Sequence, residues 1–105
     1  MRTFQDGERT FEIDEDGFIQ EPDRWDRVLA GALARTDGVA ELTEEHWRVI
    51  DYLRGYWLQY GSAPMIRKLV KATDLPLRRI YELFPKGPAM GACRVAGLPR
   101  PTGCV

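Results

Sequence analysis

The chain has 105 residues, of which 44% are hydrophobic and 30% are charged, and its formal net charge is −1. This length allows one domain with a single core, and this composition excludes a disordered chain. No apolar run approaches the roughly 20 residues that span a bilayer, and the first residues lack the features of a secretory signal peptide, so we expect a cytoplasmic protein. The charge is divided, because residues 1–60 hold 7 basic and 14 acidic side chains and residues 61–105 hold 8 basic and 2 acidic ones.

The N-terminal segment predicts a β-hairpin over about residues 1–20, with Asp6-Gly7 as its turn. Its apolar residues are Phe4, Phe11, Ile13 and Phe18. The run Asp14-Glu15-Asp16-Gly17 is similar to the start of a calcium-binding loop. It lacks the later glutamate of the twelve-residue frame, so it predicts a second turn and no metal site.

Helices are predicted over about residues 22–96. Pro22 opens the first, which closes at Asp37-Gly38, and Thr43 begins a capping box for the longest helix, which ends at Gly61. The apolar residues at helical spacing are Trp25, Val28, Leu29, Ala32 and Leu33 in the first helix, and Trp47, Ile50, Tyr52, Leu53, Trp57 and Tyr60 in the second. His46, in the first turn of the second, is interpreted as a cap or surface residue because no nucleophile or orienting partner stands near it in the sequence.

Residues 64–72 predict a basic amphipathic helix, and residues 77–84 predict another after a break at 73–76. Two short helices joined in this way resemble a helix-turn-helix, which helical bundles also use as a packing corner. Architecture is the favoured interpretation, and contact with DNA or a protein partner stays open. The basic residues that would make such a contact are Arg67, Lys68, Lys71, Arg78 and Arg79.

Both cysteines lie near the C-terminus. Pro88 and Gly97 bracket a short helix that contains Cys93. Beyond it, Gly97, Pro99, Pro101 and Gly103 fall at alternate positions, which predicts an extended, mobile arm over residues 98–105 with Cys104 near its tip. We therefore expect a mainly α fold: one small helical bundle over residues 1–97, with an N-terminal β-hairpin, a helix-turn-helix-like corner and a flexible C-terminal arm.

Two cysteines in a reducing cytoplasm favour a redox or transfer role over a stabilising disulfide. Two cysteines and one histidine do not form a recognisable zinc set, so neither a metal nor another cofactor is expected. Ten residues separate the two cysteines, which is enough for the arm to fold back and bring the sulfurs together. Arg94 and Arg100 should favour the thiolates of Cys93 and Cys104, whereas the terminal carboxylate opposes ionisation of Cys104.

Several segments carry a family resemblance. They are Asp14–Phe18, Leu42–Trp47, Tyr52–Arg54, Tyr81–Pro85, Gly87–Ala89 and Ala92–Val105. They resemble the DsrC/TusE family, and most of all DsrC, the small sulfur-carrier or gamma subunit of dissimilatory sulfite reductase. TusE proteins typically keep only the penultimate cysteine, so the presence of both Cys93 and Cys104 favours the DsrC branch.

The resemblance implies a sulfur-carrier and redox partner of the reductase's alpha and beta subunits, with no catalytic activity alone. In that role Cys104 would meet the sulfur species at the reductase's sirohaem, and Cys93 would join it in a trisulfide that a membrane-associated reductase resolves. One alternative is a persulfide relay in sulfur oxidation or tRNA 2-thiolation, supplied by upstream sulfurtransferases. Another is a DNA-binding regulator that uses the helix-turn-helix.

Overall fold

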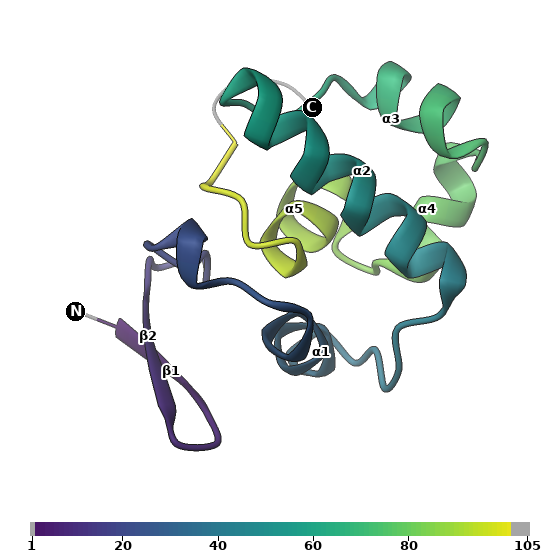
Figure 1. Cartoon of the computed structure of the whole chain (residues 1–105). Helices are drawn as coiled ribbons and strands as arrows, with labels where there is room; N and C mark the ends of the chain where they lie inside the picture. The colour runs from purple at the N-terminus through teal and green to yellow at the C-terminus, as the bar shows by residue number, and fades with distance from the viewer. Residues whose placement is uncertain (1, 102–105) are drawn as a thin grey trace.

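A computed structural model describes residues 2–101, in which helices pack around a short central helix and a β-hairpin lies at one end (Figure 1). The elements are β1 Arg2–Asp6, β2 Arg9–Ile13, α1 Arg27–Thr36, α2 Glu44–Tyr60, α3 Ile66–Thr73, α4 Leu77–Leu83 and α5 Cys93–Val95. The predicted mainly α bundle with an N-terminal hairpin is confirmed. Cys104, with the other residues after Pro101, lies outside the described part of the chain.

The hairpin is antiparallel, and Phe4 lies opposite Phe11 in its register. Gly7, in the predicted turn, has a φ of 62°, a conformation that glycine adopts without steric cost. The second predicted turn is also present, because one carboxylate oxygen of Asp14 accepts hydrogen bonds from the backbone N–H groups of Asp16 and Phe18, both at 2.9 Å. These bonds give that oxygen a structural role.

The first helix begins later than the sequence pattern predicts. Pro22 opens only a 3-10 turn, Pro22–Arg24, and Trp25 then takes an extended conformation with a ψ of 141°. Asp26 starts α1 anew, because its side chain accepts a 2.8 Å hydrogen bond from the N–H of Leu29. The prediction of one continuous helix from Pro22 was therefore wrong, and Val28, expected on the buried face, is 66% exposed. The break leaves Trp25 outside the helix.

The longest helix, α2, has the predicted ends. The N–H of Thr43 donates a 3.0 Å hydrogen bond to Nδ1 of His46, so a histidine takes the place that Glu or Gln usually holds in a capping box. Gly61 ends the helix with a φ of 76°. The buried face is Val49, Ile50 and Leu53, whereas Tyr60 is 59% exposed and lies outside the core.

The predicted corner consists of α3 and α4. Asp74 ends α3 in the left-handed conformation, with a φ of 58°, and Leu77 starts α4 after Pro76. Leu69, Ile80 and Leu83 are buried, so both helices contribute to the core. Within residues 2–101, no helix is long and apolar enough to cross a membrane.

The segment from Pro88 to Leu98 packs into the bundle, with Met90 exposed. It forms a π-helix, Pro88–Ala92, followed directly by α5, which contacts both α1 and α2. Its buried apolar residues are Ala92, Cys93, Val95, Ala96 and Leu98. The predicted short cysteine helix is therefore present, and the rest of the molecule is built around it (Figure 1).

Candidate functional site

Cys93 begins α5 and is completely buried, with 0% of its surface exposed. Its backbone N–H donates to the carbonyl of Pro88, which is the wide hydrogen bond of a π-helix. Gly91, two residues earlier, permits close packing of the π-helix on Phe84, since a Cβ added to Gly91 would lie 3.2 Å from Cβ of Phe84. Such π-turns are frequently found at functional sites.

Burial also controls the chemistry of this thiol. It raises the pKa of Cys93 to about 12, because the surrounding apolar groups disfavour the thiolate. At neutral pH Cys93 is therefore a protonated free thiol inside the core. A thiolate is needed for nucleophilic attack, so Cys93 cannot react until this segment opens to water.

Arg94 points away from solvent and into the C-terminal end of α1. Its guanidinium forms an ion pair with Asp37 at 3.3 Å. It also donates to the carbonyls of Gly17 and Leu33 and to the hydroxyl of Thr36, at 3.2, 3.3 and 2.8 Å. The pKa of Cys93 is raised by burial, and the charge of Arg94 does not offset this because Asp37 neutralises it. The contacts of Arg94 thus anchor α5, a role that differs from the expected support of a Cys93 thiolate.

All four carbonyls at the end of the cysteine helix are satisfied, although helix ends usually leave such groups without intrahelical partners. The donors to the carbonyls of Cys93, Arg94, Val95 and Ala96 are, in that order, Leu98 N at 3.1 Å, Gly97 N at 3.0 Å, Trp25 Nε1 at 2.8 Å and Arg54 Nη1 at 3.2 Å. The first two bonds form a Schellman motif with Gly97 in the left-handed conformation at a φ of 73°. Local backbone therefore supplies two donors, and distant side chains supply the other two.

Trp25 and Arg54 also contact each other. The guanidinium of Arg54 lies 4.4 Å from the ring centroid of Trp25, and it donates a second hydrogen bond to the carbonyl of Pro22 at 3.3 Å. The sequence pattern assigned neither residue to the site. Trp25 was expected on a helix face, and the only signal for Arg54 was its place in the segment Tyr52–Arg54 of the family resemblance.

One residue of the predicted arm belongs to the core. Leu98, placed by its sequence at the start of the arm, is only 1% exposed and belongs to the core. This follows from the Schellman motif, whose residue after the glycine commonly makes an apolar contact with the helix. Pro99 and Arg100 are exposed, and the Arg100 guanidinium pairs with Asp16 at 3.0 Å. Cys104 lies beyond the described residues, so its predicted role stays a prediction.

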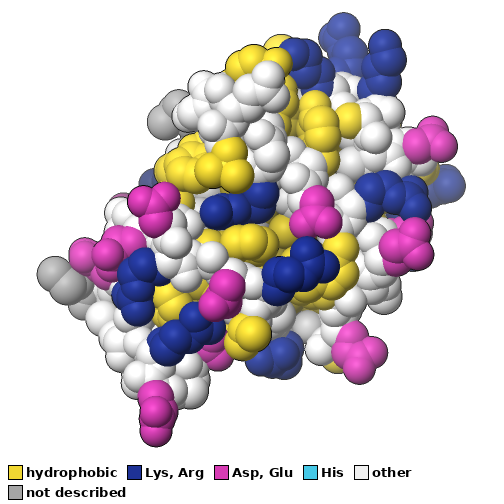
Figure 2. Space-filling model, viewed as in Figure 1, with side chains coloured by type: hydrophobic (Ala, Val, Ile, Leu, Met, Phe, Trp, Pro, Cys, Tyr) yellow, Lys and Arg dark blue, Asp and Glu magenta, His cyan; other side chains and the backbone are white. Residues whose placement is uncertain are grey.

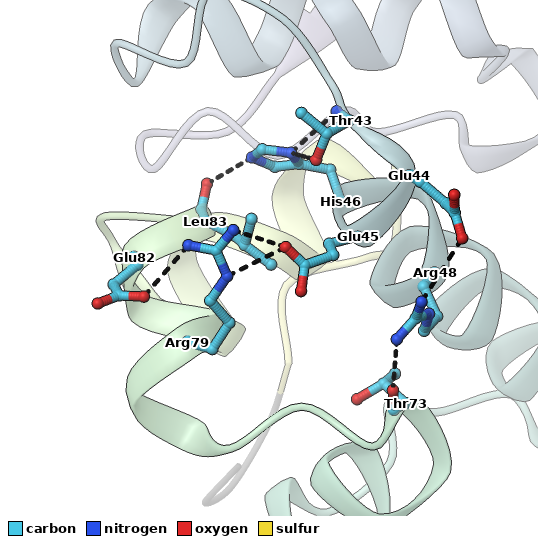
Figure 3. A network of polar contacts seen from close by, with 9 residues as sticks. All are labelled: Thr43, Glu44, Glu45, His46, Arg48, Thr73, Arg79, Glu82 and Leu83. Atoms are coloured by element: carbon cyan, nitrogen blue, oxygen red, sulfur yellow. Dashed lines mark hydrogen bonds and ion pairs between the residues drawn. The ribbon is translucent and has the colours of Figure 1, made fainter.

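The only histidine of the chain is a buried cap (Figure 3). Because Nδ1 of His46 accepts from Thr43 N, the proton lies on Nε2, which donates to the carbonyl of Leu83 at 2.9 Å. Burial lowers the pKa of His46, so the ring is neutral at neutral pH. The interpretation of His46 as a cap residue is confirmed.

The basic residues of the corner differ in what they contact. Arg79 is bound to Glu45 at 2.5 Å and to Glu82 at 3.2 Å (Figure 3). Arg67, Lys68, Lys71 and Arg78 are exposed, and Figure 2 shows Lys and Arg side chains gathered at the α3 edge of the molecule. Lys68 lies 5.4 Å from the ring of Tyr56, beside a groove of about 490 Å³ between α2 and α3. Nucleic-acid contact by this set stays a prediction.

In the described part of the chain, no group of three or more His, Cys, Asp or Glu side chains could hold a metal ion. Among the described residues, the candidate reactive group is the Cys93 thiol. The structure around it controls the access of Cys93 to water and the path by which the chain leaves α5.

Comparison with known proteins gives a consistent result. Residues 5–105 match the family model described as DsrC like protein. The chain is 44% identical over 97 residues to the dissimilatory-type sulfite reductase subunit gamma of Nitratidesulfovibrio vulgaris Hildenborough, with 92% of each chain covered. It is 40% identical over 99 residues to the sulfurtransferase TusE of Salmonella paratyphi A, covering 88% of this chain and 90% of that one. In a crystal structure of dissimilatory sulfite reductase I, one chain is 42% identical and superposes with a TM-score of 0.92, covering 99% of this chain and all of that one. The protein therefore belongs to the DsrC-like family.

Proposed function

We propose that the protein is a sulfur carrier and redox partner that takes up sulfur at Cys104 and resolves it with Cys93. The observation that carries this proposal is the contrast between the two thiols. Cys93 is buried in the core, whereas Cys104 follows six residues after Leu98, the last buried residue in the part of the chain that the structure describes. The names of the two relatives, a sulfite reductase gamma subunit and a sulfurtransferase, agree with this chemistry.

The length of the arm suits delivery into another protein. Six residues from Leu98 to Cys104, at about 3.3 Å each when extended, give a reach of about 20 Å. The reach is counted from Leu98 because that residue is held in the core. The contacts of Arg94 are all made within the core, and Arg100, four residues before Cys104, would favour its thiolate only after leaving Asp16, with which it pairs at 3.0 Å.

The burial of Cys93 requires that the loading of Cys104 comes before resolution by Cys93. A sulfur species on Cys104 cannot be resolved while Cys93 is protonated and inaccessible, so the loaded arm can travel before resolution begins. Once this segment opens, the two cysteines bridge the sulfur atom as a trisulfide. The sulfur delivered to Cys104 must therefore still be partly oxidised, as in a Cys–S–S–OH group, so that the Cys93 thiolate forms the new S–S bond and hydroxide leaves as water. This partly reduced sulfur is the oxidant of both thiols, and an external reductant must then supply four electrons and four protons to release hydrogen sulfide and restore the two thiols.

The proposed partners follow from this sequence of steps. The alpha and beta subunits of dissimilatory sulfite reductase would load the arm, and a membrane-associated reductase would unload the trisulfide. The similarity to a gamma subunit and to a chain of a sulfite reductase crystal structure supports the first partner. The carrier would act as a protein co-substrate of these enzymes, without catalysing a reaction alone.

The test compares three variants in sulfite reductase turnover: Cys104→Ser, Cys93→Ser and a chain ending at Pro101. Ending at Pro101 keeps both Leu98 and the Arg100–Asp16 ion pair, so the fold should be unchanged. We expect the shortened chain and Cys104→Ser to be inactive, and Cys93→Ser to gain the mass of added sulfur without releasing sulfide. Thr102→Ser, which keeps both thiols, is the matched control. Full activity of the chain ending at Pro101 would refute the proposal.

A persulfide relay is the second candidate, favoured by the 40% identity to a TusE sulfurtransferase. In a relay, an upstream sulfurtransferase would load Cys104 and an acceptor protein would unload it, so Cys93 would not be needed. Normal sulfur transfer by Cys93→Ser, with loss in Cys104→Ser, would identify the relay.

A DNA-binding regulator remains the alternative from another class, since Arg67, Lys68, Lys71 and Arg78 are exposed on the corner. A regulator would lose its function when Lys71 and Arg78 are neutralised and keep it in Cys104→Ser. Electrophoretic mobility shifts at several salt concentrations would measure the expected phosphate contacts.

A further inference from the structure

Arg54 carries a positive charge but forms no ion pair among the residues that the structure describes. Within residues 2–101 no carboxylate pairs with it, and its side chain is half-buried against Trp25 and near Trp57, at 4.4 and 5.6 Å from the two ring centroids. Removing a charge from water is unfavourable unless other contacts compensate. The compensating contacts here are the two carbonyls of Pro22 and Ala96 and the two indole rings, and the more distant charge of Asp23 also favours the cation. One of those carbonyls is the last of the cysteine helix.

Trp25 makes the adjoining contact. Its indole N–H donates to the carbonyl of Val95 at 2.8 Å, and the broken start of α1 places it where it can do so. Trp25 and Arg54 thus hold two consecutive carbonyls, Val95 and Ala96, immediately before the chain turns at Gly97. Neither carbonyl could be reached by the backbone donors of the Schellman motif, which are used on Cys93 and Arg94.

The turn itself is pressed against the indole. A Cβ added to Gly97 would lie 2.2 Å from Cδ1 of Trp25, so backbone and ring are in direct contact. The left-handed φ of 73° then sends Leu98 back into the core. The two held carbonyls and the packed turn together restrain the direction in which the following chain leaves the helix.

The direction of this turn sets where the chain after Leu98 starts. For a chain that is extended over about 20 Å when it enters a partner, a change of about 10° at its base displaces the tip by about 3.5 Å. Misplacing a reacting group by about 1 Å can lower a reaction rate by about 100-fold. A carrier that inserts a thiol into another protein therefore depends on how its arm is aimed.

We propose that Trp25 and Arg54 are positioning residues for sulfur transfer, which fix the direction in which the arm leaves the cysteine helix. This role rests on the proposed sulfur-carrier function, but the aim of the arm can be measured without any sulfur chemistry. Neither side chain meets the sulfur. Both act through the carbonyls of Val95 and Ala96 and through the turn at Gly97.

The fold contains a matched control. Arg27 lies 3.8 Å from the ring centroid of Trp47 and pairs with Asp51 at 3.4 Å, so it forms a second arginine-on-tryptophan pair between α1 and α2. In the described part of the chain, neither Arg27 nor Trp47 donates a side-chain hydrogen bond to residues 93–98. The test variants are Trp25→Phe and Arg54→Met, and the controls are Trp47→Phe and Arg27→Met. Arg54→Lys keeps the charge and tests for partial rescue.

The first measurement is of arm direction. In a Cys93→Ser background, spin labels on Cys104 and on a cysteine introduced by Glu44→Cys, whose side chain is 91% exposed on α2, report the distance distribution by pulsed electron paramagnetic resonance. We expect Trp25→Phe and Arg54→Met to broaden or shift this distribution, Arg54→Lys to do so less, and both controls to leave it unchanged. A residue with only a stabilising role would lower the melting temperature without moving the distribution.

The second measurement is sulfur transfer with both native cysteines present, at a temperature where circular dichroism shows every variant folded. We expect the transfer rate to be about 10-fold to 100-fold lower in Trp25→Phe and Arg54→Met. The controls should transfer sulfur at the wild-type rate. An unchanged distance distribution in both test variants would overturn the positioning role, whatever happens to the rate. If the distribution moves but the wild-type chain transfers no sulfur, the positioning role stands and the proposed function fails.

Discussion

The guanidinium of Arg94 lies 3.3 Å from the carboxylate of Asp37, in an ion pair whose side chains are only 11% and 4% exposed. Asp37 caps the C-terminal end of α1, and Arg94 is the second residue of α5, so this pair ties the cysteine helix to its neighbour. The pair also accounts for Gly17, since a Cβ there would lie 2.7 Å from Nε of Arg94.

Arg94→Met should destabilise the fold by about 3–5 kcal/mol, because it leaves the carboxylate of Asp37 buried without its main partner. Urea unfolding measures this cost. The double variant Arg94→Met with Asp37→Asn should lose less than the sum of the two single variants. Glu44→Gln removes an ion pair whose carboxylate is 91% exposed and should change the unfolding free energy little, so equal effects of Glu44→Gln and Arg94→Met would contradict this account.

His46 should make the stability depend on pH. Its folded-state pKa is lowered from 6.5, first by burial, so the unfolded chain binds the proton more readily. The stabilisation is therefore complete above pH 6.5 and is lost as the pH falls through the folded-state pKa. His46→Gln keeps a side chain that can cap Thr43 N but does not titrate. Urea unfolding between pH 8 and pH 5 should show a smaller fall in stability for this variant than for the wild type, and parallel curves would rule out His46 as the source.

Gly97→Ala should be more harmful than Gly38→Ala. Both glycines have positive φ angles, 73° and 85°, so alanine strains the backbone at each. Only at Gly97 would the new Cβ also meet a ring, 2.2 Å from Trp25, whereas nothing lies within 4 Å at Gly38. We expect about 1 kcal/mol for Gly38→Ala and clearly more for Gly97→Ala, measured by thermal unfolding. Equal losses would show that the contact with Trp25 relaxes at no cost.

Brief, limiting iodoacetamide at pH 8 should label Cys104 and spare Cys93. Burial raises the pKa of Cys93 to about 12 and leaves it 0% exposed, so this thiol offers neither a thiolate nor access. In Cys104→Ser, labelling should appear only when urea unfolds the chain, as mass spectrometry would detect. Rapid labelling of Cys93 in the folded protein would mean that this segment opens readily.

The parts of the fold that follow from the sequence are those set by local chemistry. The Asp6-Gly7 turn, the Thr43 cap and the Gly61 stop were each predictable from a few neighbouring residues. The start of α1 was not, because Pro22 and Asp26 compete to begin the helix and each can do so. The burial of Leu98 also has a local cause, since an apolar residue directly after a helix-ending glycine often packs back on the helix.

The candidate site divides in the same way. The helix around Cys93 was predictable from Pro88 and Gly97, which bracket it. Trp25 bonds to Val95 across 70 positions of sequence, and Arg54 bonds to Ala96 across 42. Such pairings cannot be predicted from periodicity or spacing in the sequence, because they depend on how α1 and α2 pack around α5. The family resemblance identified the two thiols and left these donors unassigned.

The burial of Cys93 also bears on damage by oxidants. Irreversible oxidation of cysteine to sulfinic and sulfonic acids proceeds through the exposed thiolate. Cys93 is enclosed and protonated while the fold is closed, so peroxide has no route to it. Under the proposed function, a resolving thiol kept in the core would be protected from such damage until the step that exposes it.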